Sequence, residues 1–520
     1  MGTEQQIAYF LGELRDANPH SDSHANPHAD SHANLERRAA AAKGLGRIGR
    51  PEHAGALAEA ADDPVPAVRA AVALGLGRLA RLGRPGVPAA GGTVLPRLMH
   101  DTDPWVRRRA SVAAIRLKLT GLTVTDAFVD LLDDPDHHLR INALDGLDAL
   151  GVTGDVAALA RLIGDPEGAV WGRAWKLLYR FRDDPAVRGE VIRTAREGEG
   201  AARAQVLEML PRDCTERLLD SLLTGLRDPS AQVRYAVARR LLDLKSHSVR
   251  DALVEALRTE RDPEVAGLLL SGLGWHGERR VTDLAVRWLG DPRAGRDAAT
   301  ALGHLGTGTA VEHLRRALTD RAVPETTRGA AAVEVGRAGR WDAVWLLLPL
   351  LDDPGAEVRA GAVDGLGALV HDGLRFWERR PVAEALTAHL ASERDDTWRT
   401  CNALDGLNEA LPALRRLADE AASDEVRGAA LRLLAAGDTV SLQDVQRFER
   451  GLGDEQEEVR YQAVQGLARW VANGVLPSLD RAVRDRLTTV TTDASPRLRR
   501  AATELLEAVD TSREPQPGEA

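Results

Sequence analysis

Apolar residues recur along this chain at the spacing of an amphipathic helix. In stretches such as DPVPAVRAAVALGLGRLA, residues 63–80, and DPDHHLRINALDGLDALG, residues 134–151, Val, Ala and Leu stand at positions i, i+4 and i+8. This spacing gives a helix one apolar stripe. No stretch shows the competing alternation of apolar and polar residues that is typical of a strand. The pattern therefore predicts an all-α protein.

One sequence unit is repeated throughout the chain. Each copy begins with Asp, often followed by Pro, and places Val-Arg or Leu-Arg so that the Arg stands six residues after the Asp. A segment rich in Ala and Leu follows. A second amphipathic segment precedes the Asp, as TERLLDSLLTGLR, residues 215–227, precedes Asp228. The period is about 31 residues, and about fifteen such helical pairs fill the chain.

A single helical pair cannot bury both of its apolar stripes, so neighbouring pairs must stack. We expect an α-solenoid, a superhelix of about fifteen helical pairs, that continues without a break over residues 1–510. A disordered tail over residues 511–520 is expected to follow it. We also expect the Asp of each unit to cap the second helix of its pair, with the Pro in that helix's first turn.

The unit DPxxxVRxxA at this short period resembles HEAT repeats, in particular the HEAT-like repeats named after phycobilin lyases. The resemblance covers the chain from about Tyr9 to Val509. It implies that the Asp and the Arg form a structural ladder between adjacent repeats. The matching residues are Asp63 and Arg69, Asp101 and Arg107, Asp134 and Arg140, Asp228 and Arg234, Asp353 and Arg359, Asp454 and Arg460, and Asp493 and Arg499.

Three units depart from this pattern at the arginine position. Trp171 takes it in DPEGAVWGRAWKLL, and Ala266 takes it in DPEVAGLLLSGLG. In DDTWRTCNALDGL, Arg399 stands one residue out of register.

Composition narrows the class of protein. The formal net charge is -10, whereas proteins that bind nucleic acid or membrane surfaces are normally basic. The preference for Arg over Lys, with abundant Ala, Gly, Val and Leu, is typical of a GC-rich bacterial genome. The N-terminal MGTEQQIAYFLGELRD has no basic segment followed by an apolar core, and no run of about 18 apolar residues occurs. We expect a monomeric cytoplasmic protein without a membrane segment.

Motifs that carry chemistry are absent or have simpler explanations. GLGRIG at Gly44 matches the dinucleotide pattern, but it ends a helix instead of following a strand. The deoxyhypusine hydroxylases, which have HEAT-like repeats, hold iron through His-Glu dipeptides, and none of the fourteen histidines here precedes Glu. The cysteines, Cys214 and Cys401, are too few for a disulfide framework or a zinc quartet. We expect no catalytic residues and no cofactor.

An acidic cluster next to two histidines is the remaining candidate for a metal site. It consists of Asp130, Asp133, Asp134, Asp136, His137 and His138. Because Asp134 belongs to the repeat pattern and the others fall on a solvated turn, we expect no metal there.

Tryptophan is unusually frequent, with ten Trp against five Phe and four Tyr. The simpler explanation of any single Trp is that it fills a gap between stacked repeats, and the alternative is a binding surface. Trp171 and Trp175 share one helix face, and Trp171 replaces a ladder Arg. Trp398 falls on another second helix. Trp171, Trp175 and Trp398 are therefore candidate partner-binding residues.

The hexad NALDGL occurs twice, at residues 142–147 and 402–407. If Leu139, Ala143 and Leu147 form the buried stripe, the hexad's Asn and Asp lie away from it. This placement predicts a polar, acidic row on the inner, concave face that could bind a partner. The alternative is that these residues lie on solvated helix faces of duplicated repeats and have no binding role. The row consists of Asn142, Asp145, Asp364, Asn402 and Asp405.

Two histidine-rich octads, NPHSDSHA and NPHADSHA, occupy residues 18–33. Removing them shortens the spacing between Asp16 and Arg38 to six residues, the spacing in the other units. They therefore form an insertion in the turn of the first repeat. Since Pro19 and Pro27 exclude one continuous helix, we expect a mobile, solvated loop, with weak binding of a transition metal as the alternative.

These features favour a non-catalytic scaffold or adaptor that binds a protein or peptide on its concave face. The phycobilin-lyase resemblance suggests an alternative, a chaperone-lyase or biosynthetic accessory enzyme that acts on a small molecule bound to a partner. Nucleic-acid binding is a further alternative, which the acidic charge disfavours.

Overall fold

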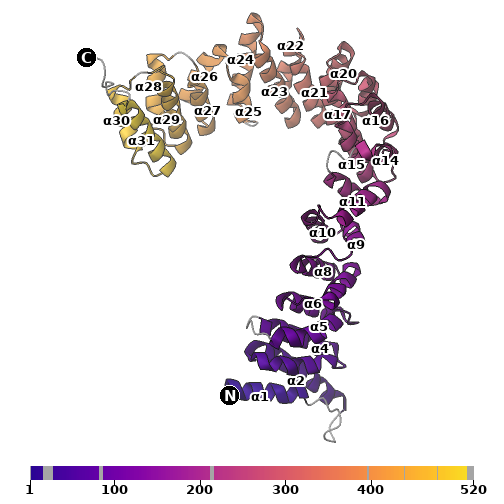
Figure 1. Ribbon diagram of the computed structural model, residues 1–520. Coiled ribbons are helices and arrows are strands. Elements are labelled where there is room, and N and C mark those ends of the chain that lie inside the picture. The colour runs from indigo at the N-terminus through magenta and orange to yellow at the C-terminus, as the bar shows by residue number, and fades with distance from the viewer. Residues whose placement is uncertain are drawn as a thin grey trace, which may run out of the picture. The chain divides into compact units, whose positions relative to one another are not determined.

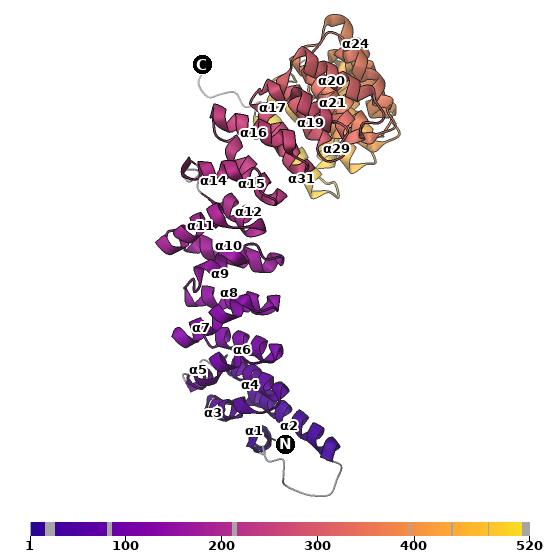
Figure 2. The ribbon, with the colours of Figure 1, turned by 90° about the vertical axis from the view of Figure 1, so that its right-hand side faces the viewer.

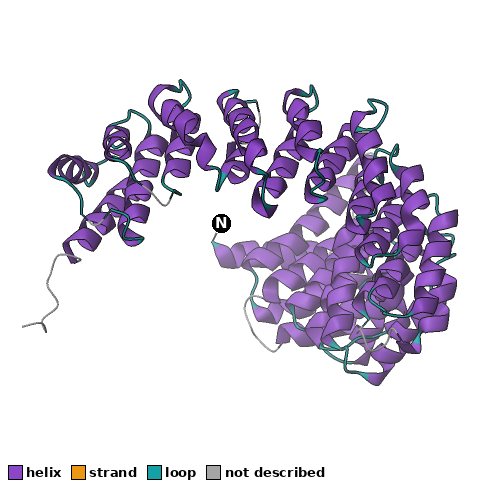
Figure 3. Ribbon diagram, turned by 90° about the horizontal axis from the view of Figure 1, so that it is seen from above, coloured by secondary structure: helices purple, strands orange, loops and turns teal. Residues whose placement is uncertain are grey.

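A computed structural model describes residues 2–15, 27–80, 86–210, 216–394, 397–437, 440–476 and 478–511; for 27–35, 209 and 511 it describes the backbone alone. Within these residues the chain forms thirty α-helices joined by short turns, and Figure 3 shows helices and loops without a strand. The helices follow one another in sequential pairs. The predicted all-α solenoid of about fifteen HEAT-like helical pairs is confirmed.

The helices divide into two compact units, Met1–Leu241 and Leu242–Ala520. The expectation of one unbroken solenoid over residues 1–510 stays a prediction. No helix in the described part of the chain combines the length and the apolar content needed to cross a membrane.

The first unit is built from two layers of helices (Figures 1 and 2). The second helices α2, α4, α6, α8 and α10 contact one another in this order, and the first helices α3, α5 and α7 do the same. Its helices are α1 (Thr3–Arg15), α2 (Pro27–Ile48), α3 (Ala54–Glu59), α4 (Pro66–Leu79), α5 (Gly86–Leu98), α6 (Pro104–Arg116), α7 (Leu122–Asp130), α8 (His137–Leu150), α9 (Val156–Leu162), α10 (Gly168–Arg180), α11 (Pro185–Glu197), α12 (Gly200–Met209), α14 (Leu219–Gly225) and α15 (Ala231–Leu242).

The second unit repeats the two-layer design. Its second helices contact one another in order from α17 to α31, and in Figure 1 the first helices α20, α22 and α24 lie above α21, α23 and α25. Its helices are α16 (His247–Thr259), α17 (Pro263–Trp275), α18 (Thr282–Trp288), α19 (Gly295–Leu305), α20 (Gly308–Thr319), α21 (Glu325–Arg337), α22 (Ala343–Leu347), α23 (Ala356–Asp372), α24 (Phe376–Ala391), α25 (Thr397–Leu404), α26 (Leu411–Glu420), α27 (Asp424–Leu434), α28 (Leu442–Gly451), α29 (Glu457–Ala472), α30 (Arg481–Val490) and α31 (Pro496–Thr511).

Apolar stripes and small residues explain how the layers stack. In α8 the stripe Leu139, Ala143 and Leu147 is completely buried. A Cβ atom added to Gly46 of α2 would lie 2.6 Å from the Cα of Gly75 in α4, so the two helices touch backbone to backbone. The glycines that imitate a dinucleotide motif are therefore sites of close helix packing.

The structure corrects the predicted role of the repeat Asp. α8 begins at His137, and its cap is Asp136, which accepts a hydrogen bond from the backbone N–H of His138 at 2.9 Å. Asp134 instead accepts from the N–H of Asp136, so its carboxylate closes the turn that leads into the helix. Pro135 precedes the helix and does not lie in its first turn.

The structure shows helix at one end of each predicted flexible segment. α2 begins at Pro27, so residues 27–33 of the histidine-rich insertion are helical. The loop prediction is wrong for them because a Pro at the first helical position loses no hydrogen bond, so the helix can extend that far. The rest of the insertion, 18–26, lies outside the described residues. α31 includes Thr511, and residues 512–520 of the tail lie outside the described residues.

Candidate interaction surface

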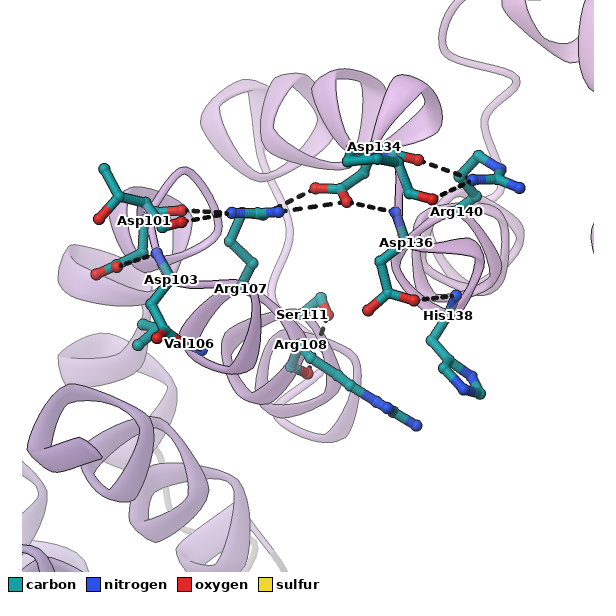
Figure 4. A network of polar contacts seen from close by, with 12 residues as sticks. Asp101, Asp103, Val106, Arg107, Arg108, Ser111, Asp134, Asp136, His138 and Arg140 are labelled. Carbon is teal, nitrogen blue, oxygen red and sulfur yellow. Dashed lines mark hydrogen bonds and ion pairs between the residues drawn. The ribbon is translucent and has the colours of Figure 1, made fainter. Parts of the chain in front are cut away.

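A row of Arg–Asp contacts links consecutive repeats of the first unit (Figure 4). Nη1 of Arg107 donates to the backbone carbonyl of Asp101 in its own repeat at 2.9 Å. Nε of the same guanidinium donates to the carboxylate of Asp134 in the next repeat at 2.8 Å. Both side chains are largely buried. One arginine therefore fixes the turn of its own repeat and binds the turn of the following one.

The same contact recurs in both units. Carboxylates of the following repeat are bound by Arg38, Arg69, Arg140, Arg203, Arg328, Arg427 and Arg460, whose partners are Asp63, Asp101, Asp165, Asp228, Asp353, Asp454 and Asp493. Arg234, Arg359 and Arg499 donate to the backbone carbonyl of the Asp six residues earlier.

Hydrogen bonding to the ladder carboxylate of Asp101 outweighs the cost of burying it. Burial alone would raise the pKa of the Asp101 carboxyl. The hydrogen bonds from Arg69 and from the backbone N–H of Asp103 lower that pKa more than burial raises it. The charged form of Asp101 is therefore favoured by folding.

Sequence reasoning missed several members of this ladder. Arg328 and Arg427 lack an Asp six residues before them, although Arg427 binds the carbonyl of Ala421 at that position. Glu260 stands in for the Asp of one repeat, and its carboxylate accepts from the N–H groups of Arg261 and Asp262. A search for an Arg that precedes small residues near the start of a helix, without the Asp, would have found Arg328 and Arg427.

Trp171 occupies the ladder position of α10 and begins an exposed aromatic stripe. Trp171, Trp175 and Tyr179 follow one another at four-residue intervals and are 37%, 36% and 50% exposed. Four residues after the ladder position, the preceding second helices carry Ser111 and Leu144, which are 0% and 1% exposed. The face that is covered in the regular repeats is thus partly open in α10.

Packing around α10 accounts for this exposure. Each of the regular second helices α4, α6 and α8 contacts the second helix that follows it, whereas the principal neighbours of α10 are α8 and α9. α12 packs mainly on α11 and α9. The rings of Trp175 and Tyr179 stack with their centroids 5.1 Å apart, and the guanidinium of Arg182 lies over Tyr179 at 4.7 Å. The stripe is therefore a preformed aromatic surface with a cation at one end.

The predicted acidic row is largely engaged in contacts within the chain. Asn142 donates to the hydroxyl of Ser111 at 2.9 Å. Asp145 pairs with Arg173 of α10 at 2.7 Å, and Asp364 pairs with Arg399 of α25. These side chains do not form the free acidic surface that the sequence suggested, because arginines of the next second helix neutralise the two carboxylates.

The second hexad differs in conformation from the first. Asn142–Leu147 lies within α8, whereas α25 ends at Leu404, before Asp405, and Gly406 adopts a φ of +78°. The prediction that the second Asp lies on a helix face is wrong. The next α-helix begins at Leu411 and has a Pro at its second position, which disfavours one continuous helix through the hexad and beyond. Asn402 and Asp405 are both exposed.

Most tryptophans do not fill gaps between repeats. Trp470 is buried and Trp288 is half-buried. The other eight are exposed, namely Trp105, Trp171, Trp175, Trp275, Trp341, Trp345, Trp377 and Trp398. Gap filling is thus the wrong explanation for these eight.

The acidic cluster near α8 shows no shared site. Asp130 binds His100 at 2.7 Å, Asp133 pairs with Arg161, and Asp134 and Asp136 serve the ladder and the helix cap. Among the described residues, no three His, Cys, Asp or Glu side chains are grouped so that they could hold a metal ion. Cys401 is buried, and Cys214 lies outside the described residues.

Comparisons with known proteins agree with the fold. A family model for HEAT repeats matches residues 27–116, 176–273 and 251–333, so these segments are HEAT repeats. A crystal structure of importin β is similar over 98% of this chain and 82% of that chain, with 12% identity and a TM-score of 0.59. Yeast importin-β is similar over 98% and 73% of the two chains, with 12% identity and a TM-score of 0.46. No curated protein sequence matches the chain.

Proposed function

We propose that this protein is a non-catalytic scaffold that binds a protein partner through the aromatic stripe of α10. The observation that carries the proposal is the partial exposure of Trp171, Trp175 and Tyr179 on a face that is covered in the preceding repeats. Large aromatic side chains that remain exposed on a solenoid are favoured anchors for a partner, because each offers much apolar area with little conformational entropy to lose.

The form of the partner follows from the repeat. In α4, α6 and α8 this face receives the second helix of the next repeat. A partner segment that adopts an amphipathic helix would cover the stripe of α10 in the same way, with apolar side chains at i, i+3 or i+4, and i+7. The surrounding basic side chains Arg173, Lys176 and Arg180 already pair with Asp145 or Asp148, so binding would depend mainly on apolar contact.

The test is affinity purification of the full chain from its native lysate with identification of the retained proteins by mass spectrometry. The double variant Trp171→Ala/Trp175→Ala should lose a partner that the unchanged chain retains at a stoichiometric level. Trp105→Ala, which removes an exposed Trp from α6, is the matched control and should retain it. Retention by all three chains would contradict the proposal.

The finer assignments have separate support. The Asp-Pro and Val-Arg positions support the proposal that these HEAT repeats are of the phycobilin-lyase type. The arginine-rich composition supports a bacterial source. The presence of only two cysteines in the sequence supports a cytoplasmic location. That the protein is monomeric is likewise a proposal, for which sedimentation of the purified chain is the measurement.

A further inference from the structure

A basic surface extends over three consecutive second helices of the first unit, α2, α4 and α6. These helices contact one another in this order, so their outward sides adjoin (Figure 2). We call this surface the basic face, and define it by six cationic side chains that are exposed or half-buried. They are Lys43 and Arg47 of α2, Arg78 of α4, and Arg108, Arg109 and Arg116 of α6.

The register of α6 places its cations away from the core. The buried residues of this helix lie on one side, whereas Arg109 and Arg116 are exposed on the other side, about two turns apart. Arg108 lies beside them, with its guanidinium 5.5 Å from the centroid of the Trp105 ring. Figure 4 shows that Arg108 points away from the ladder residues. These three arginines are therefore separate from the ladder.

One outward position carries an arginine in all three helices. Arg47, Arg78 and Arg116 each stand nine residues after the ladder arginine of their own helix. Nη1 of Arg78 also donates to the backbone carbonyl of Lys43 at 3.4 Å, which joins α4 to α2 on this side. The basic face is therefore a property of the stacked repeats and not of one helix.

The positive charge of the basic face remains when the nearby carboxylates are counted. The ladder arginines of these helices are left out because each pairs with an Asp. Glu36 is the only carboxylate among the described side chains of α2, α4 and α6, and Asp103 caps the start of α6. Six cations against these two carboxylates give a net charge of +4. Among the described residues, no carboxylate pairs with Lys43, Arg109 or Arg116.

The next two second helices differ, because they neutralise each other. Asp145 and Asp148 of α8 pair with three cations of α10. The charge of the whole sequence shows the same contrast. Residues 36–118 contain fifteen Arg and Lys against seven Asp and Glu, a net charge of +8, whereas the rest of the chain has a net charge of -18. The positive excess is thus confined to the repeats that carry the basic face.

Short apolar side chains lie between the cations. The outward positions of α4 before Arg78 are Ala67, Ala70 and Leu74, of which the first is exposed and the other two are half-buried. Val112 of α6 is also half-buried and lies between the two exposed arginines of that helix. The basic face therefore offers an apolar strip on α4, with cations of α2 on one side and cations of α6 on the other.

We propose that the basic face binds an acidic amphipathic helix of a protein partner. The apolar side chains of that helix would lie on α4, and its carboxylates would meet the cations of α2 and α6. A DNA duplex fits less well, because each strand carries a phosphate about every 3.4 Å, whereas neighbouring second helices lie about 8–10 Å apart and α4 offers one outward cation. The apolar strip also has no counterpart in a phosphate backbone. This proposal does not depend on the aromatic stripe of α10.

The proposal is tested with the full chain and a random linear-peptide library displayed on phage. The library is depleted on the variant Lys43→Glu/Arg109→Glu and then selected on the unchanged chain, so that the remaining peptides depend on the basic face. They should be rich in Asp and Glu and carry apolar residues at i, i+3 or i+4, and i+7. Both substituted side chains are exposed, so this variant should keep the melting temperature of the unchanged chain.

A second variant measures the contribution of the arginines. Arg109→Ala/Arg116→Ala should bind the best selected peptide, made synthetically and labelled with fluorescein, about tenfold or more weakly, because two charge-assisted hydrogen bonds are lost. Fluorescence anisotropy measures the affinity. The binding of this peptide should also weaken as the salt concentration rises.

Two controls separate the basic face from net charge and from the stripe of α10. Arg287→Glu/Arg296→Glu makes the same change in charge at two exposed positions of the second unit and should bind the peptide as the unchanged chain does. Trp171→Ala/Trp175→Ala should also bind it equally. The proposal is overturned if no peptide remains after depletion, if the selected peptides are basic or neutral, or if Arg109→Ala/Arg116→Ala binds equally. Tight binding of a fluorescent DNA duplex that Lys43→Glu/Arg109→Glu loses would overturn it in favour of a nucleic acid.

Discussion

α8 and α10 are consecutive second helices that occupy the same position in their repeats and differ in what covers them. α8 carries Arg140 at the ladder position, which pairs with Asp165 of the next repeat, and Leu144 four residues later, which is buried. α10 carries Trp171 and Trp175 at these positions, and both are partly exposed. The comparison teaches that a repeat can change a stacking face into an exposed aromatic face by altering few positions, while the rest of the helix still packs.

The largest expected effect comes from breaking the ladder in the regular repeats. Arg107→Ala should lower the free energy of unfolding by about 3–5 kcal/mol, because it leaves the buried carboxylate of Asp134 without its cation. Urea denaturation of the full chain, with hydrogen exchange on α6 and α8, measures the change. Arg173→Ala is the control from α10, where the half-exposed pair with Asp145 should contribute about 1 kcal/mol or less. Equal losses of unfolding free energy in the two variants would contradict this distinction between buried and half-exposed pairs.

The second prediction compares the same repeat position in the two helices. Leu144→Ala removes a fully buried side chain of α8 and should cost about 2–5 kcal/mol. Trp175→Ala removes a larger side chain of α10, but it should cost only about 1 kcal/mol because part of that side chain already meets water. The two variants are compared by urea denaturation. If the Trp variant loses as much stability as the Leu variant, the face of α10 is not open.

The third prediction compares two Gly→Ala variants, which should change the stability of the chain in opposite directions. A Cβ atom on Gly75 of α4 would lie 2.8 Å from the carbonyl oxygen of Ala42, so Gly75→Ala should destabilise the chain by about 1–3 kcal/mol. A Cβ atom on Gly172 of α10 would meet nothing within 4 Å, and Gly172→Ala should stabilise the helix by about 0.5–1 kcal/mol. Thermal melts distinguish the two, and a shift in the same direction for both would refute this view of α10.

The smallest expected effect concerns acid. The pKa of Asp101 is lower in the folded chain than in the unfolded chain, so its contribution to stability is full above about pH 4. That contribution is lost as the pH falls through the lowered folded value. Asp101→Asn should therefore lose less stability between neutral pH and pH 3 than the unchanged chain does. Identical acid dependence of the two melting temperatures would show that Asp101 contributes nothing.

The repeat spacing was sufficient to predict the fold. An Asp with an Arg six residues later places a tight turn before a helix, and the apolar stripe of that helix requires a neighbour. Arg107 and Arg140 could be identified this way because each donates both to its own turn and to the next one. Their partners in space, Asp134 and Asp165, follow from the next repeat of the same pattern.

Other features depend on contacts that the pattern does not contain. The two NALDGL hexads are identical in sequence, but Gly146 remains helical against Phe128, whereas Gly406 turns the chain. The residues after the hexad decide between these outcomes. The exposure of Trp171 could not be predicted either, because it depends on where α12 packs. A Trp at a ladder position indicates a departure without saying whether the ring is covered.

The ladder has a direction, and this affects how the chain forms during synthesis. Each arginine binds a carboxylate that comes later in the sequence, 32 residues later for Arg69 and 27 for Arg107. As the chain leaves the ribosome, the newest completed repeat therefore holds a guanidinium without its carboxylate until the next turn emerges. Growth from the N-terminus adds one stabilising contact with each repeat that carries such an arginine, so in these repeats the nascent chain is least stable at its advancing end.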